Sequence, residues 1–300
     1  MTVNAAIDLG TNSLRLIIAE VSHNKINVLK ETSYMCRVGQ SLQKTGFIKE
    51  DVMARIHEHL LEIKELLNQY QVKSVHFVAT SALRDAKNAS EFNDMVTSTG
   101  LKMEIISGIK EAQIIAKAVH CYVPNISNNS IFIDQGGGSV EFIHFIPGNE
   151  TYCSLDLGIV RLTEQFFAQS PPTDKEVSKF KEFNLHALNQ NLKPILNSKP
   201  DQLIVLGGTG STLAMIYNKL TVYDSQIVHK TVINLSFLKG MIQDLQSLTS
   251  SEIQTKYSLA EKRSDIFFSG VLQIYYWLTF FNVDSFIVCD KGLRYGLLLD

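Results

Sequence analysis

The 300-residue chain has little of what marks several large classes of protein. Its four cysteines, Cys36, Cys121, Cys153 and Cys289, stand far apart without a CxxC pair. That spacing argues against a disulfide framework or a structural zinc site and fits a reducing cytoplasm. Only six prolines argue against a Pro-rich scaffold. The net charge of −2 disfavours a basic nucleic-acid-binding domain. We therefore expect a cytoplasmic protein with no nucleic-acid partner.

Long uncharged runs are also scarce. The start, Met1 to Ile7, has no charged region followed by a long apolar stretch, so the sequence shows no signal peptide. Ile266 to Val283 carries no charge and is just long enough to span a bilayer. It contains several polar side chains and is flanked closely by Asp265 and Asp284. We expect a buried core helix there and no membrane partner.

The composition supports two globular domains. The hydrophobic fraction is 45% and the charged fraction 19%, which suffices for a real core. Domains average roughly 150 residues, so the length predicts two. The polar stretch Pro124 to Asn129 is the candidate boundary. We predict domains over 1–124 and 125–300, with the last helix, about 292–300, packing back on the first domain.

Periodicity and turn residues predict the secondary structure. A capping-box pattern at Thr173 and Glu176 predicts a helix that runs to about Leu192. The other predicted helices cover 50–70, 90–99, 111–120, a segment from 211, 266–282 and 293–299. The predicted strands cover 3–8, 14–21, 25–34, 75–79, 103–106, 130–134, 140–146, 151–155, 203–206 and 286–289.

A short motif occurs twice. Ile7 to Ser13 and Ile133 to Ser139 share Ile, Asp, Gly and Ser at the same spacing, and each loop joins two apolar strands. Chance similarity of two strand-turn-strand units is one interpretation. The other is an ancient duplication that left two like domains facing one another.

Both motifs predict loops that bind phosphate. Glycine permits positive φ and leaves no Cβ in the way, so successive backbone N–H groups can form a nest for an anion. A plain tight hairpin turn is the alternative. A third cluster begins at Gly207 and adds Gly208, although a helix-packing turn explains it equally well. The candidate phosphate-binding residues are Gly10, Thr11, Asn12, Ser13, Gly136, Gly137, Gly138, Ser139 and Gly208.

Acidic residues precede both loops. Asp8 and Asp134 end their strands beside the predicted phosphate sites, where a carboxylate repels phosphate unless a cation intervenes. Mg²⁺ binds carboxylates together with phosphate oxygens, and turn capping is the alternative role. Glu141 follows Asp134 by the same interval as Arg15 follows Asp8. The two halves therefore place opposite charges at matching positions.

A series of motifs along nearly the whole chain resembles the exopolyphosphatase and guanosine pentaphosphate phosphohydrolase family, within the actin and sugar-kinase superfamily. The resemblance implies an α/β fold of two ribonuclease-H-like (actin-like) domains with an interdomain cleft. It also implies a short form, since longer relatives carry a C-terminal helical domain. The matching stretches are Ala6–Leu16, Ala79–Asn88, Ile106–Ala112, Asp134–Glu141, Leu157–Glu164 and Gly292–Gly296.

The resemblance also assigns catalytic roles. It implies that Glu111 activates the attacking water and that Arg84 grips phosphate oxygens. From the residues alone, Ser107 caps a helix and places Glu111 in its first turn, where the dipole favours the ionised form. The alternative for Glu111 is an ordinary glutamate in the first turn of a helix, and the alternative for Arg84 is a surface salt bridge.

By the same resemblance, Asp134, Glu141 and Asp8 bind Mg²⁺ or another divalent cation. The chain departs from the usual pattern at Lys110, where the family has an acid, and at Val140, where it commonly has threonine. It departs again at Gln135, which replaces an apolar residue, and at Gln113, which replaces an arginine.

The expected function is Mg²⁺-dependent hydrolysis of the terminal phosphate of inorganic polyphosphate. Hydrolysis of guanosine pentaphosphate is the alternative activity. A non-catalytic sensor that binds guanosine tetraphosphate or another nucleotide is the alternative of a different class, motivated by Lys110 and Val140. A kinase is a further one. The expected partner is polyphosphate or a guanosine polyphosphate. The sequence does not decide whether the chain forms a homodimer.

Overall fold

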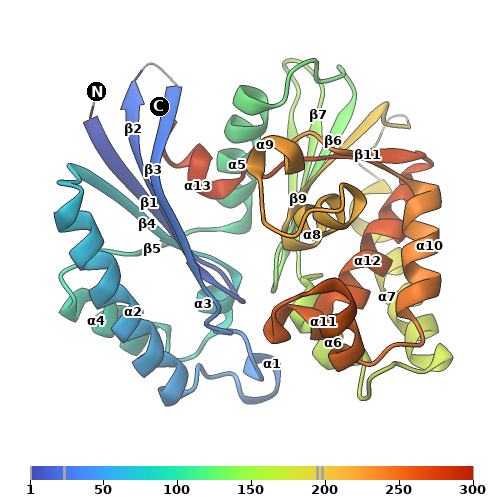
Figure 1. Cartoon of the computed structure of the whole chain (residues 1–300), viewed down its shortest axis with the longest axis horizontal. Helices are drawn as coiled ribbons and strands as arrows, with labels where there is room; N and C mark the ends of the chain where they lie inside the picture. The colour runs from blue at the N-terminus through green and yellow to red at the C-terminus, as the bar shows by residue number, and fades with distance from the viewer. Residues whose placement is uncertain (1, 23–24, 194–195, 197–198, 300) are drawn as a thin grey trace. The chain divides into compact units, whose positions relative to one another are not determined.

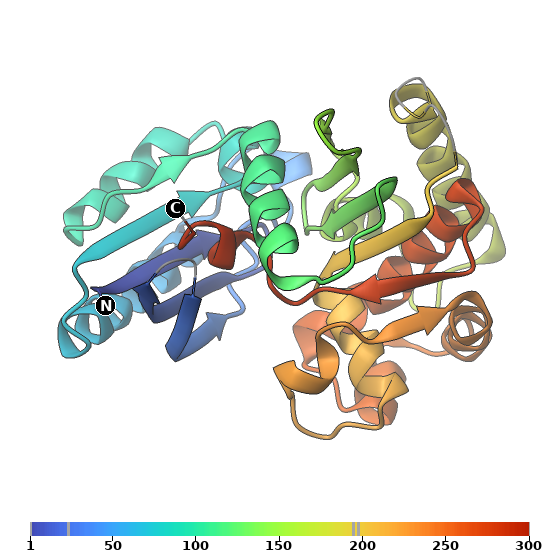
Figure 2. The same cartoon turned by 90° about the horizontal axis from the view of Figure 1, so that it is seen from above.

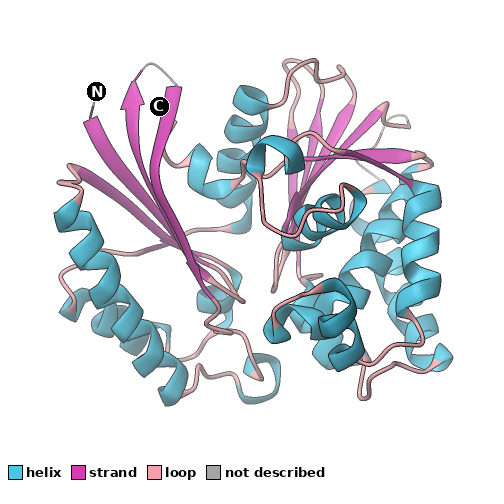
Figure 3. Ribbon diagram, in the orientation of Figure 1, coloured by secondary structure: helices cyan, strands magenta, loops and turns pink. Residues whose placement is uncertain are grey.

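The computed structural model describes residues 2–22, 25–193, 196 and 199–299. The chain divides into two compact units. Unit 1 consists of Met1–Tyr122 with Lys291–Asp300, and unit 2 of Val123–Asp290. Each unit has its own mixed sheet with helices packed on it (Figure 3).

Unit 1 contains a five-stranded sheet in the order β3-β2-β1-β4-β5. The first three strands are antiparallel neighbours, whereas β4 and β5 continue the sheet in parallel with β1. The register sets Asp8 opposite Arg15, at the end of the β1–β2 hairpin. The strands are β1 (Thr2–Leu9), β2 (Leu14–Ser22), β3 (Lys25–Tyr34), β4 (Ser74–Ala79) and β5 (Glu104–Ile105).

Helices cover both faces of this sheet (Figure 1). The amphipathic stripe predicted for the long helix α2 is confirmed, because Ile56, Leu60 and Ile63 are buried against one face. On the other face, Ala118 and Tyr295 pack on strands β1 and β2, with α13 beside α5 in both views (Figures 1 and 2). The helices are α1 (Leu42–Thr45), α2 (Glu50–Gln69), α3 (Ser81–Asp85), α4 (Ala89–Ser98), α5 (Gly108–Tyr122) and α13 (Leu293–Gly296).

Unit 2 contains a six-stranded sheet in the order β10-β11-β9-β6-β7-β8. The strands β6, β7 and β8 are antiparallel, and β9 and β11 continue in parallel with β6, so unit 2 repeats the five-strand pattern of unit 1. The α/β class and the pair of ribonuclease-H-like domains are therefore confirmed. The strands are β6 (Ser130–Gln135), β7 (Val140–Phe145), β8 (Thr151–Leu155), β9 (Gln202–Gly207), β10 (Val232–Asn234) and β11 (Ser285–Val288).

The core of unit 2 forms around α12, which contains the uncharged run that begins at Ile266. Trp277 and Phe267 of this helix are buried in one cluster with Ile133 and Phe142 of the sheet. Among the described residues, no helix is both long and apolar enough to cross a bilayer. The helices are α6 (Ile159–Phe166), α7 (Asp174–Asn191), α8 (Gly208–Tyr217), α9 (Ser225–Val228), α10 (Leu235–Leu245), α11 (Ser250–Tyr257) and α12 (Glu261–Phe281).

Candidate active site

Unit 1 brings the two predicted catalytic residues together. Ser107 Oγ accepts a hydrogen bond from the backbone N–H of Lys110, which caps α5 and leaves Glu111 in its first turn, as predicted. The Glu111 carboxylate is buried, and its Oε2 lies 3.0 Å from Arg84 Nη1. The same nitrogen donates to the carbonyl oxygen of Ile106 at 3.0 Å. The guanidinium therefore holds the carboxylate in one orientation, against the end of β5.

The first glycine loop rests on the segment that follows β3. The backbone N–H of Gly10 donates to Ser13 O at 2.9 Å and closes the turn. The carbonyl oxygen of Thr11 then accepts from Gly39 N at 2.9 Å, and that of Asn12 accepts from Cys36 N. A Cβ on Gly39 would come within 2.2 Å of Thr11 Cγ2, so the Thr11 side chain packs directly against the backbone of Gly39. The backbone carbonyl groups of the loop therefore fix it to the segment that follows β3.

Asp8, the third expected metal ligand, lies among arginines. Burial raises the pKa of Asp8, while Arg15 opposite it and Arg294 both oppose that rise. Arg294 donates to the carbonyl oxygen of Leu16 at 3.1 Å and lies 3.6 Å from Glu31 Oε1. Burial in turn lowers the pKa of Arg294. Two arginines therefore lie near Asp8, and its expected role as a metal ligand stays a prediction.

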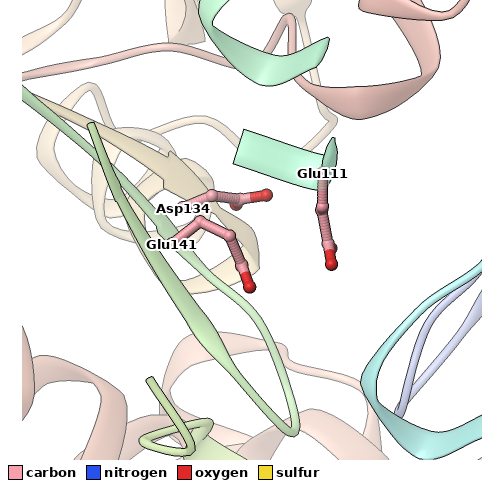
Figure 4. Close-up of side chains that lie close together, drawn as sticks. All are labelled: Glu111, Asp134 and Glu141. Carbon is pink, nitrogen blue, oxygen red and sulfur yellow. The ribbon is translucent and has the colours of Figure 1, made fainter. Parts of the chain in front are cut away.

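Unit 2 supplies a pair of carboxylates from neighbouring strands. The register sets Asp134 at the end of β6 directly opposite Glu141 at the start of β7. Figure 4 shows their side chains leaving the two strands on the same side; it also labels Glu111, at the start of α5 in unit 1. Ligand oxygens of the pair lie within 4.8 Å of each other. Glu141 is buried, and its Oε1 accepts a hydrogen bond from Ser154 Oγ at 2.8 Å.

The second glycine loop joins this pair and is built like the first. The N–H of Gly136 donates to Ser139 O at 3.1 Å. The carbonyl oxygens of the three loop glycines accept backbone N–H groups from 158–161, at the start of α6. A Cβ on Gly158 would come within 2.2 Å of Gly138, so only glycine permits this contact. Because the carbonyls bond to α6 and the N–H of Gly136 bonds to Ser139 O, the N–H groups of Gly137 and Gly138 are the loop donors that face neither partner.

The expectation that positive φ at glycine shapes the two loops was wrong. Among the described glycines, only Gly46, Gly100, Gly148 and Gly207 have positive φ, so the two predicted loops do not depend on left-handed backbone. Close approach explains Gly136 instead, where a Cβ would lie 2.7 Å from Ser139 O. In the third cluster, positive φ occurs at Gly207, which caps α8, rather than at Gly208, its first residue.

The carboxylate pair fits a hard divalent cation. Like charges directly opposite on neighbouring strands repel each other, and burial increases the cost of the charged forms. A cation that contacts both carboxylates would offset that cost, and oxygen ligands are those that Mg²⁺ prefers. The donor set of Asp134 and Glu141 therefore suits the metal that was predicted for them.

Several residues of this framework have weak sequence signals. No sequence pattern pointed to Ser154, because serine is common in strands and its hydrogen-bond partner, Glu141, is 13 residues away. Gly158 lay within a motif stretch, but its contact with the glycine loop depends on the fold. Arg161, which donates from Nε to Gly138 O at 2.9 Å, shares that motif. The sequence did not predict that Arg161 bonds to the glycine loop.

The sequence pattern of the Ppx/GppA phosphatase family matches residues 17–300. The chain belongs to this family. A bifunctional 3-dehydroquinate synthase/phosphatase of Fusobacterium nucleatum subsp. nucleatum is 30% identical over 314 residues, which include 99% of this chain and 46% of that protein. The chain therefore spans about half the length of that relative. Exopolyphosphatase 2 of Mycobacterium tuberculosis is 29% identical over 91% of this chain and 89% of its own.

Solved structures of the family agree with the fold described above. The Ppx/GppA family member of Aquifex aeolicus is 33% identical and has a TM-score of 0.84, over 99% of this chain and 96% of that one. An exopolyphosphatase from Cytophaga hutchinsonii is 25% identical with a TM-score of 0.91, over 98% of this chain and 96% of its own. The chain is thus a Ppx/GppA-family phosphatase of actin-like, two-domain fold.

Proposed function

We propose that this Ppx/GppA phosphatase hydrolyses the terminal phosphate of inorganic polyphosphate with the aid of Mg²⁺. The observation that carries the proposal is the carboxylate pair of Asp134 and Glu141, which stand on either side of a glycine loop. The carbonyl groups of that loop bond to backbone N–H groups of 158–161, which leaves the N–H groups of Gly137 and Gly138 for an anion. A phosphate chain is the ligand class that needs both N–H donors and a cation.

Unit 2 binds the cation and phosphate in this proposal. Asp134 and Glu141 hold the cation, and the hydroxyl of Ser154 keeps the Glu141 carboxylate oriented toward it. The loop from Gly136 to Ser139 receives phosphate oxygens at the N–H groups of Gly137 and Gly138. When bound, the cation neutralises charge on the phosphate oxygens during transfer.

Unit 1 contributes the proton transfer in this proposal. Glu111 takes a proton from the attacking water and needs to be ionised to do so, which its place in the first turn of α5 favours. Arg84 orients this carboxylate through Nη1. A guanidinium carries five N–H groups, so the same side chain is suited to grip the phosphate that is being released.

Polyphosphate is proposed over guanosine pentaphosphate because two of the relatives are named exopolyphosphatases. Their names describe those proteins, so the substrate of this chain needs its own measurement. A sensor without activity is the candidate of another class. It is motivated by Lys110, an exposed cation beside Glu111, and by Val140, whose buried side chain offers no hydroxyl to the loop.

The test is release of phosphate by the purified protein from polyphosphate and, separately, from guanosine pentaphosphate, each with Mg²⁺ and with excess chelator. We expect Mg²⁺-dependent release that is faster from polyphosphate. Asp134→Asn should remove most of it, whereas Asp94→Asn, which neutralises an exposed carboxylate on α4, should not. Faster release from guanosine pentaphosphate would change the substrate. No release from either, with tight binding of guanosine tetraphosphate, would establish the sensor instead.

A further inference from the structure

Three amide side chains are buried in the core of unit 2, beneath its glycine loop. Gln135 of β6 is 3% exposed, and Asn184 of α7 and Gln273 of α12 are fully buried. Along β6, Gln135 follows Ile131 and Ile133 on the face that packs into the apolar core. Side chains alternate between the two faces of a strand, so this position calls for an apolar residue. A glutamine there requires an explanation.

The three amides form one connected network. Gln135 Nε2 donates to Gln273 Oε1 at 2.9 Å and to the carbonyl oxygen of Gly270 at 3.1 Å. Gln273 Nε2 donates to the carbonyl oxygen of Leu157 at 2.7 Å and to Asn184 Oδ1 at 3.0 Å. The partners fix each orientation, because turning Gln135 or Gln273 round would set its oxygen against two other oxygens.

The network contacts the glycine loop at two points along the chain. Gln135 directly precedes Gly136, the first residue of the loop. Leu157 directly precedes Gly158, whose backbone lies against that of Gly138. Gln273 bonds to both Gln135 and Leu157, so one side chain of α12 ties together the beginning of the loop and the segment that holds its carbonyl groups.

Stability alone does not account for Gln135. Its Oε1 is buried, and in the described part of the chain it has no hydrogen-bond partner. An incompletely satisfied polar network is less stable than an apolar core of the same shape. An apolar residue at this position would remove the unpartnered oxygen. It would also remove the hydrogen bond between Gln135 and Gln273, which links the start of the loop to α12.

We propose that Gln135 and Gln273 are positioning residues that hold the loop from Gly136 to Ser139 in the geometry that binds phosphate. The inference rests on the proposed function, because it takes this loop to be the phosphate site. The two glutamines touch no reacting atom. They act by restricting the backbone of the loop and of the turn at Gly158, so that the N–H groups are preorganised for the anion.

The test compares Gln135→Leu and Gln273→Leu with Ile274→Val, which removes one methylene from the next buried residue of the same helix. Two readouts apply: the Kd of tripolyphosphate with Mg²⁺, and hydrogen exchange of the peptide over 134–140, measured by mass spectrometry. Each glutamine variant loses two or more hydrogen bonds, so we expect about tenfold weaker binding and about tenfold faster exchange in that peptide. Exchange in α12 and the binding by Ile274→Val should stay as in the wild type.

Gln135→Met, which fills a similar volume without hydrogen bonds, replaces Gln135→Leu if that variant does not fold. Unchanged exchange in the 134–140 peptide would overturn the proposal, as would equal acceleration in this peptide and α12, since that indicates general loss of stability. If the wild-type protein releases no phosphate from either substrate, the proposed function fails. The exchange comparison would still decide whether the glutamines order the loop.

Discussion

Glu111→Gln tests the proposed chemistry at one atom. The substitution removes the charge and the basicity of the carboxylate while it keeps the shape of the side chain. A general base contributes a factor of about 10² to 10⁴ in rate. That factor corresponds to about 2.7–5.4 kcal/mol in the activation barrier. We therefore expect kcat to fall by at least a hundredfold, with little change in the affinity for substrate.

The effect on folding is expected to be much smaller. In the wild type, Glu111 Oε2 lies 3.0 Å from Arg84 Nη1, and both side chains are largely buried. The glutamine keeps an oxygen that accepts from Arg84, so a charge-assisted hydrogen bond becomes a neutral one. That change costs about 1 kcal/mol, whereas a domain is stable by roughly 5–15 kcal/mol. The variant should stay folded, so a loss of rate reports on the chemistry.

The assay measures kcat and KM for polyphosphate across pH, together with the urea midpoint of unfolding. Glu104→Gln is the matched control, because it neutralises an exposed carboxylate on β5 in the same unit. We expect the control to behave as the wild type. If Glu111→Gln retains kcat within threefold, Glu111 is not the base. If its KM rises instead while kcat holds, the residue contributes to binding alone.

Three further predictions concern unit 2. Ser154→Ala removes the hydroxyl that donates to Glu141. The Kd of Mn²⁺ should rise about 10- to 100-fold, which is the usual effect of losing a hydrogen-bond partner of a metal ligand. An unchanged Kd, measured by electron paramagnetic resonance, would refute this role of Ser154. Gly158→Ala should prevent folding of the loop region, because the new Cβ would lie 2.2 Å from the backbone of Gly138. Gly240→Ala in α10 is the control: a Cβ there meets nothing within 4 Å, and alanine favours a helix more than glycine does, so the melting temperature should rise. The backbone N–H of Thr173, which caps α7, is the main cause of the lowered pKa of Glu176. This contribution to stability is present above the unfolded pKa and is lost as pH falls through the folded pKa, so Glu176→Gln should lower the urea midpoint at pH 7, and the difference from the wild type should shrink in acid.

Local patterns predicted much of the secondary structure. The spacing of apolar residues located α2 and α12, and the pair Thr173 and Glu176 located the start of α7 by its capping box. The same signature, Thr249 with Glu252, begins α11 and was overlooked. Helix α6 was also missed, because in eight residues it shows little more than two turns of pattern.

The sequence alone determined the two loops, the acidic residues beside them and the α/β class, because turn chemistry and periodicity depend on neighbouring residues. The tertiary structure decided the partners. Arg84 reaches Glu111 across 27 residues, and Gln135 reaches Gln273 across 138. Arg294 meets Leu16 across 278. Such pairs depend on the register of the strands and on how helices pack against them, and no local pattern of residues encodes that choice.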